Sequence, residues 1–149
     1  MKNLLTILIT VFFVTSMNAQ NIYDVKKEEN KFIYGESIKL FLGDKIFVET
    51  KLVDNSLKDF KIVNTISDSS RTIIIEFNYD NFGMQKASIL KVSNPFERSL
   101  NYKAKIKPTS KSSYSETSIM PVFSKIYSME TWPNKLESII LSDFKLDKK

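Results

Sequence analysis

A regular alternation of apolar and polar residues at positions 100–107 constrains the fold of this chain more than any other feature. The apolar members of this ladder are Leu100, Tyr102, Ala104 and Ile106, and the polar members are Asn101, Lys103, Lys105 and Lys107. A period of two is that of a β-strand with one buried and one solvated face. Pro95 and Pro108 bound the ladder, since proline cannot donate to a strand ladder. The sequence therefore predicts a strand here, preceded by a turn at Asn94-Pro95.

The same period recurs along most of the chain. It predicts strands over residues 37–42, 45–53, 60–66, 71–79, 85–93 and 136–146, and an edge strand or irregular extended segment over 119–127. Three consecutive isoleucines, Ile73 to Ile75, favour a central strand. Gly43-Asp44 predicts a hairpin turn between the first two strands. Segments 54–59, 67–70, 109–118 and 129–134 are predicted loops.

About seven to nine strands without a helix are typical of an all-β domain. We predict a single antiparallel β-sandwich over residues 20–149, with a small β-barrel as the alternative. Only three glycines are present in the chain, and tightly curved barrels need glycine at their bends. This scarcity favours the sandwich.

The first 19 residues have the pattern of a secretory signal peptide. Lys2 precedes an apolar run from Leu4 to Val14, and small or polar residues lead to Ala19. The run is about a dozen residues long, whereas a membrane-spanning helix needs roughly 20. Cleavage after Ala19 would leave 130 of the 149 residues. The expected location is the periplasm or the extracellular space, with no integral span after cleavage.

Several chemistries lack the residues that they require. The chain contains neither histidine nor cysteine, which removes imidazole bases, thiol nucleophiles and structural zinc sites. The carboxylates that fall near predicted loop ends are Asp54, Asp59, Asp68, Asp80 and Glu97, and no D-x-D-x-D run gathers them for calcium. We therefore expect no catalytic residues, no cofactor and no metal site, and hence a protein that is not an enzyme.

The candidate contact residues belong to two groups. Lys103, Lys105 and Lys107 form a basic row that could meet an anionic surface, and Lys86 and Lys91 would extend it across a neighbouring strand. The competing interpretation is the wet side of a strand, or lysines that protect a sheet edge. The second group is aromatic and would lie at one end of the domain: Trp132, Phe82 and Phe96. Trp132 is expected to cover the open end of the core, or to stack on a ligand.

The stretches "SNPFERSLNYKAKI" and "ETWPNKLESIILSDFKL" resemble small exported proteins of unknown function from Bacteroidota-type bacteria. The rhythm of a turn proline followed by an alternating strand is also similar to immunoglobulin-like sandwich domains of bacterial envelope proteins. These resemblances imply an immunoglobulin-like sandwich and the periplasm. They carry no catalytic residue onto this chain.

The net charge of +5 is moderate, and export argues against a nucleic-acid partner. The leading hypothesis is an exported, non-enzymatic sandwich that binds another envelope component, either a protein or an anionic glycan. The alternative is a small-ligand carrier or hydrolase with a pocket between the sheets, in which carboxylates or Tyr102 converge. A third hypothesis is a subunit that adds strands to its neighbours, with residues 21–30 as a donated arm.

Overall fold

The computed structural model describes residues 32–148 of the chain. The named elements of this part are all strands: β1 (Ile33–Tyr34), β2 (Ser37–Phe41), β3 (Asp44–Val53), β4 (Ser56–Val63), β5 (Thr72–Phe82), β6 (Gln85–Ser93), β7 (Leu100–Pro108), β8 (Ser115–Thr117), β9 (Tyr127–Trp132) and β10 (Leu136–Leu146). Every pairing between them is antiparallel.

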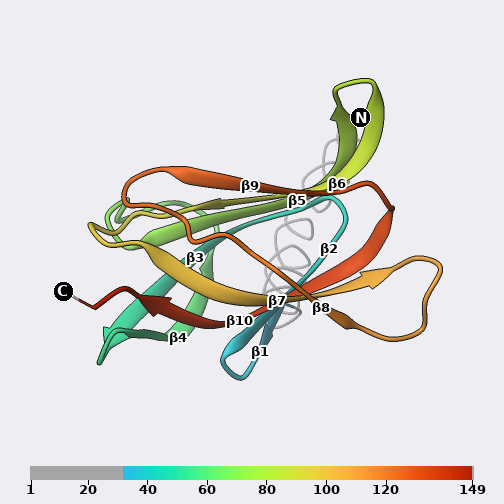
Figure 1. Cartoon of the computed structure of the whole chain (residues 1–149). Helices are drawn as coiled ribbons and strands as arrows, with labels where there is room; N and C mark the ends of the chain where they lie inside the picture. The colour runs from blue at the N-terminus through green and yellow to red at the C-terminus, as the bar shows by residue number, and fades with distance from the viewer. Residues whose placement is uncertain (1–31, 149) are drawn as a thin grey trace, which may run out of the picture. The chain divides into compact units, whose positions relative to one another are not determined.

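The strands form two layers, as Figure 1 shows. One layer has the order β4-β3-β5-β6-β9, and the other has the order β1-β2-β10-β7-β8. The layers are joined at one corner, where Lys145 of β10 pairs with Ser56 of β4. The path of paired strands is open between β1 and β9. The predicted antiparallel sandwich is therefore confirmed, and the barrel alternative is wrong.

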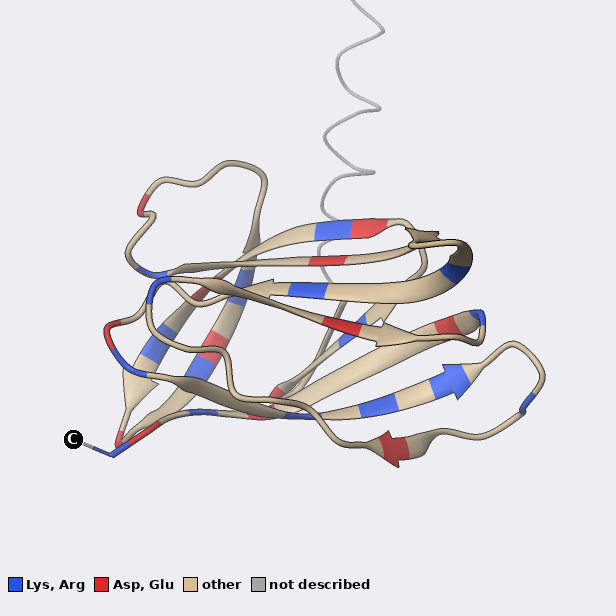
Figure 2. Cartoon of the chain, turned by 45° about the horizontal axis from the view of Figure 1, so that its top comes forward, with Lys and Arg blue, Asp and Glu red and all other residues tan. Residues whose placement is uncertain are grey.

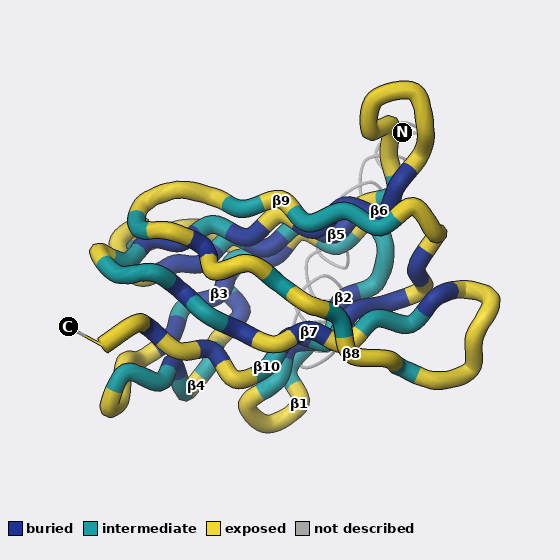
Figure 3. Tube along the Cα trace, viewed as in Figure 1, coloured by how far each residue is buried: buried dark blue, intermediate teal, exposed yellow. Residues whose placement is uncertain are grey.

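The core lies between the layers, because the alternating apolar residues of both point inward. The central strands β5 and β10 contribute Ile73, Ile75, Phe77, Ile139 and Leu141, all without exposed surface. Each such buried side chain contributes about 1.5 to 3 kcal/mol to stability. Figure 3 shows the resulting alternation of buried and exposed positions along the strands.

The predicted apolar ladder of residues 100–107 is confirmed for most of its length. Leu100, Tyr102 and Ala104 are buried, while Ile106 is partly buried and packs against the same core. The ring of Tyr102 stacks on Phe144 of β10, with ring centroids 5.4 Å apart. The bounds of β6 and β10 agree with the predicted strands 85–93 and 136–146.

The predicted hairpin at Gly43-Asp44 is wrong. β2 pairs with β1 and β10, whereas β3 pairs with β4 and β5. The turn carries the chain from one layer to the other, so that Ile38 and Ile46 reach the core from opposite sides. Gly43 has a φ of 95° here, a conformation that glycine adopts without strain.

Three of the predicted loops contain strand residues. β4 begins at Ser56 because Asp54 and Asn55, with φ of 48° and 68°, form a two-residue turn directly after β3. β8 lies inside the predicted loop 109–118, and most of the predicted loop 129–134 belongs to β9. β9 is a strand because it pairs with β6 over its whole length. The sandwich consequently has ten strands rather than the seven to nine expected.

The predicted signal peptide, residues 1–19, and the predicted arm, residues 21–30, lie outside the described residues. Between Phe32 and Lys148, the structure contains no helix of the length and apolarity needed to cross a membrane.

Candidate functional site: an apolar groove beside β9

The predicted basic row lies on the outer face of β7, and each of its three lysines pairs with a carboxylate. Lys103 Nζ lies 2.8 Å from Asp143 Oδ2, Lys105 Nζ lies 3.9 Å from Glu116 Oε1, and Lys107 Nζ lies 2.8 Å from Glu137 Oε1. β7 pairs with β10 on one side and with β8 on the other. The row therefore lies on the solvent-exposed face of β7. The strand has a neighbour on both sides at Lys105, whereas β8 does not extend to Lys103 or Lys107, so the alternative of lysines that protect a sheet edge stays open for these two.

Pairing also changes the electrostatics of this face. The hydrogen bond and charge of Lys103 lower the pKa of Asp143, and Asp143 in turn raises the pKa of Lys103. Both groups thus stay ionised at neutral pH and neutralise each other. Lys86 and Lys91 do not extend the row as predicted, since they lie on β6 in the other layer. Figure 2 shows acidic and basic positions interspersed over the strands.

The three predicted aromatic contacts do not gather at one end of the domain. Phe82 lies opposite Gln85 at the tip of the β5–β6 hairpin, and Phe96 follows the other end of β6. Phe82 is half exposed beside fully exposed Met84, on a hairpin that projects beyond the rest of the sheet (Figure 1). The expected cluster is therefore wrong.

Trp132 and Phe96 both pack against the core. Trp132 ends β9, and its Nε1–H donates a 3.2 Å hydrogen bond to Thr117 Oγ1 of β8. This contact joins the edges of the two layers, so Trp132 occupies the position expected of a residue that covers the open end of the core.

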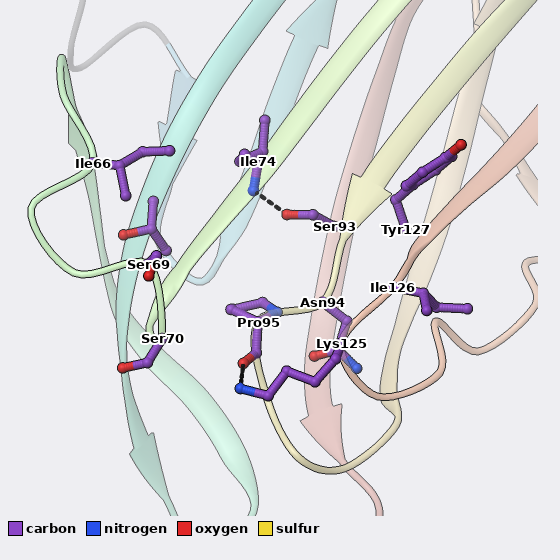
Figure 4. A pocket seen from close by; sticks show the side chains of 11 residues that line it. Ile66, Ser69, Ser70, Ile74, Ser93, Asn94, Pro95, Lys125, Ile126 and Tyr127 are labelled. Atoms are coloured by element: carbon purple, nitrogen blue, oxygen red, sulfur yellow. Dashed lines mark hydrogen bonds between the residues drawn. The ribbon is translucent and has the colours of Figure 1, made fainter.

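A groove of about 440 Å³ lies where loops meet the outer face of the β5–β6–β9 sheet. We call it the apolar groove. Its apolar lining consists of Ile66, Ile74, Pro95, Ile126 and Tyr127. Figure 4 shows Tyr127 and Ile66 on opposite sides of it, with Ile74 between them. A second hollow of about 270 Å³ adjoins it, sharing Ile74, Ser93 and Tyr127 and adding Glu76 and Lys91.

Cross-strand register explains why these residues meet. Ile74 of β5 lies opposite Phe47 of β3, and on the far side Ser93 of β6 lies opposite Tyr127 of β9. The Ser93 hydroxyl accepts a 2.8 Å hydrogen bond from Ile74 N–H, which bridges β5 and β6. Residues opposite one another on antiparallel strands share a face of the sheet. Ile74, Ser93 and Tyr127 therefore form a row across the outer face of the layer.

Several polar groups that line the apolar groove are engaged within the chain. Lys125 Nζ donates to Pro95 O at 2.8 Å and lies 3.0 Å from Glu97 Oε1. The buried Asn94 amide donates to the carbonyls of Arg98 and Val122 and accepts from Phe96 N–H. The groove therefore offers a partner mainly apolar surface on a well-held frame.

Exposed apolar side chains are frequent in the segment that leads into β9, part of which lines this groove. Five of the large, exposed hydrophobic residues fall within ten positions: Met120, Phe123, Ile126, Tyr127 and Met129. Tyr127 alone leaves 65% of its surface exposed. Ile126 and Tyr127 of this set line the groove, and exposed apolar patches often mark interaction sites.

Among residues 32–148 the buried polar groups include no carboxylate. Tyr102 Oη and Ser128 Oγ are buried side by side, and burial raises the pKa of Tyr102 strongly. The buried polar residues among positions 32–148 are Thr50, Thr72, Ser88, Asn94 and Ser138. In the same part of the chain, no three acidic side chains gather as a metal site would require. Glu130 is close enough to Tyr102 for its charge to add to the rise in the pKa of Tyr102. The hypothesis of a pocket in which carboxylates or Tyr102 converge therefore stays a prediction.

No family model, no curated protein and no solved structure matches the chain. The resemblances to exported proteins of Bacteroidota-type bacteria and to immunoglobulin-like envelope domains therefore stay predictions.

The sequence pattern does not reveal the apolar groove. Its lining comes from the loop after β4, from β5, from the turn after β6 and from the start of β9, so no single stretch displays it. Ile74 was the one available signal, since it is the isoleucine of the run Ile73 to Ile75 whose side chain must face away from the core.

Proposed function

We propose that this chain is an exported, non-enzymatic binding module of the cell envelope, and that its partner is a protein that docks on the apolar groove. The observation that carries the proposal is the groove itself, an apolar hollow on an outer sheet face that is lined by exposed Ile126 and Tyr127. Aromatic residues and methionine are enriched at protein interfaces, and charged residues are depleted at their centres.

The surrounding charges favour a protein over an anionic glycan. The lysines of β7 are neutralised by neighbouring carboxylates, so this face offers little net charge to an anion. At the groove, Lys125 is engaged by Glu97. Burial of apolar surface, at about 25 cal/mol per Å², is then the main source of binding energy.

The non-enzymatic part of the proposal is supported by the residue types present. Histidine and cysteine are absent from the sequence, and the apolar groove contains no acidic side chain. The export part depends on residues 1–19 and has its own test. The intact mass of the protein recovered from the envelope fraction should correspond to a chain that begins at Gln20.

Quantitative capture with matched variants tests the partner. The protein serves as bait in wild-type form, as an Ile126→Glu/Tyr127→Glu variant, and as a Lys103→Glu/Lys105→Glu variant. A protein of the envelope fraction should be retained by the wild type and by the lysine variant. The amount that the groove variant retains should be at least about tenfold lower. Thermal unfolding must show that both variants are folded.

The reverse pattern would overturn the proposal: retention by the groove variant and loss with the lysine variant, in a salt-dependent way. Capture of an anionic glycan that depends on Lys103 and Lys105 would have the same consequence.

A further inference from the structure

β9 is a six-residue edge strand of the β4-β3-β5-β6-β9 layer, and among the described residues it pairs only with β6. The opposite edge of this layer is β4, which pairs with β10 through Ser56 alone and carries Lys58, Asp59 and Lys61, charged side chains of the kind that protect an edge. The corresponding edges of the other layer, β1 and β8, contain two and three residues, whereas β9 contains six. Short edge strands limit pairing with other chains. β9 lacks that protection.

The direction of its backbone groups follows from one hydrogen bond. Asn94 N–H donates to Ile126 O at 2.8 Å, just beyond the pair formed by Ser93 and Tyr127. Hydrogen-bonded pairs alternate along antiparallel strands. The N–H and C=O of every second residue of β9 therefore face away from β6, and these residues are Tyr127, Met129 and Thr131.

The side chains of the same three residues lie on the outer face and carry no charge. Tyr127 and Met129 are exposed, and β9 contains neither lysine nor proline. The charged residue of β9 is Glu130, whose Oε1 accepts a 2.9 Å hydrogen bond from Met120 N–H of the same chain. Nothing on the outer row therefore repels an incoming strand.

We propose that β9 pairs with β9 of a second copy of this chain, antiparallel, with Met129 at the two-fold axis. In this register Met129 lies opposite Met129 of the second copy, and Tyr127 lies opposite its Thr131. Each such pair exchanges two N–H···O bonds, so every outward backbone group of both strands is used. The contact is self-complementary, as a two-fold interface requires.

The register also avoids unfavourable charge contacts. On the inner row Glu130 lies opposite Ser128 of the second copy, a small polar residue, and no like charges meet directly. The β4-β3-β5-β6-β9 layers of two copies become one continuous sheet. Since the pairing is edge to edge, the apolar groove stays on the outer face, and the inference does not depend on the proposed function.

Disulfide trapping tests the register, because the chain has no cysteine. Cα atoms of a hydrogen-bonded pair lie about 5.5 Å apart, within the range of a disulfide. A Met129→Cys variant should therefore form a covalent dimer in a glutathione redox buffer. A Tyr127→Cys variant should stay monomeric, since its two sulfurs would be offset by about 13 Å along the strands. Equal trapping of both variants, or of neither, would overturn the proposal.

Sedimentation equilibrium tests the backbone contact without cysteines. Wild type and Met129→Val should dimerise at or below about 100 µM. Met129→Pro loses an outward N–H that the ladder to β6 does not use, and edge strands tolerate proline there. Its dimer should be at least tenfold weaker, with thermal unfolding confirming the fold. A monomeric wild type at this concentration, or dimers unaffected by Met129→Pro, would overturn the inference. A monomer that binds an unrelated extended peptide along β9 would replace the second copy by a different polypeptide.

Discussion

The outer faces of the two layers differ in how their side chains are satisfied. Along β7 the exposed residues are lysines, and each has a carboxylate within 4 Å. In and beside β9 the exposed residues are Ile126, Tyr127 and Met129, and the first two line a groove that the described part of the chain leaves open. The lysine face is prominent in the sequence but is neutralised in the fold. The apolar face is inconspicuous in the sequence but retains apolar surface that residues 32–148 leave exposed.

Both faces depend on the same core, so a core substitution should affect them together. Phe144 of β10 is buried between Phe60 and Tyr102, at centroid distances of 5.2 and 5.4 Å. Phe144→Ala should lower the free energy of unfolding by about 3 to 5 kcal/mol, because it removes an aromatic ring and leaves a cavity. Chemical denaturation measures this loss. A loss below about 1 kcal/mol would show that the two layers do not share this packing.

Substitution of the buried polar residue Asn94 should destabilise the surroundings of the apolar groove more than the lysine face of β7. Asn94 fixes the turn beside the apolar groove through bonds to Arg98 O, Val122 O and Phe96 N–H. Asn94→Ala removes the partners of Arg98 O and Phe96 N–H, whereas Val122 O keeps its bond from Leu100 N–H. The substitution should cost about 2 to 3 kcal/mol. In hydrogen exchange, the loss of protection should be larger around residues 94–99 and 122–127 than along β7. Uniform loss over both layers would contradict this local role.

The sequence predicts the two layers better than it predicts either face. Strands such as β6 and β10 are recognisable because alternation reports directly which side chains are buried. β9 was missed because its inner row is Ser128, Glu130 and Trp132, so its alternation is not apolar. Its strand conformation comes from the ladder to β6, a contact between distant positions. The groove likewise depends on register between strands, which alternation within one strand does not specify.

Surface substitutions should then show that the two faces differ in exposed apolar surface rather than in their contribution to stability. Ile126→Ser/Tyr127→Ser and the matched Lys103→Ser/Lys105→Ser variant should each change the free energy of unfolding by only about 0.5 kcal/mol per site. The groove variant alone should elute earlier from a hydrophobic interaction column, because exposed apolar surface determines retention. Equal shifts for both variants would remove the distinction between the faces.

The smallest expected effect concerns the ion pair that neutralises the lysine face. Lys103 lowers the pKa of Asp143 first through its hydrogen bond and then through its charge. Lys103→Ala should raise the pKa of Asp143 toward its ordinary value, as a carboxyl-carbon NMR titration would show. Lys86→Ala, in the other layer, is the control and should leave that pKa unchanged.

The sign of the accompanying stability effect follows from the lowered pKa. A carboxyl group whose pKa is lower in the folded than in the unfolded state stabilises the fold above its unfolded pKa, and this contribution is lost as the pH falls through the folded value. The free energy of unfolding of the wild type should therefore be slightly higher than that of Lys103→Ala at neutral pH and equal to it in acid. The difference is small because both side chains are exposed. If the pKa of Asp143 does not respond to Lys103→Ala, the pair does not persist in solution. Lys103 would then be free for an anionic partner, and the conclusion that carboxylates neutralise the lysine face would be wrong.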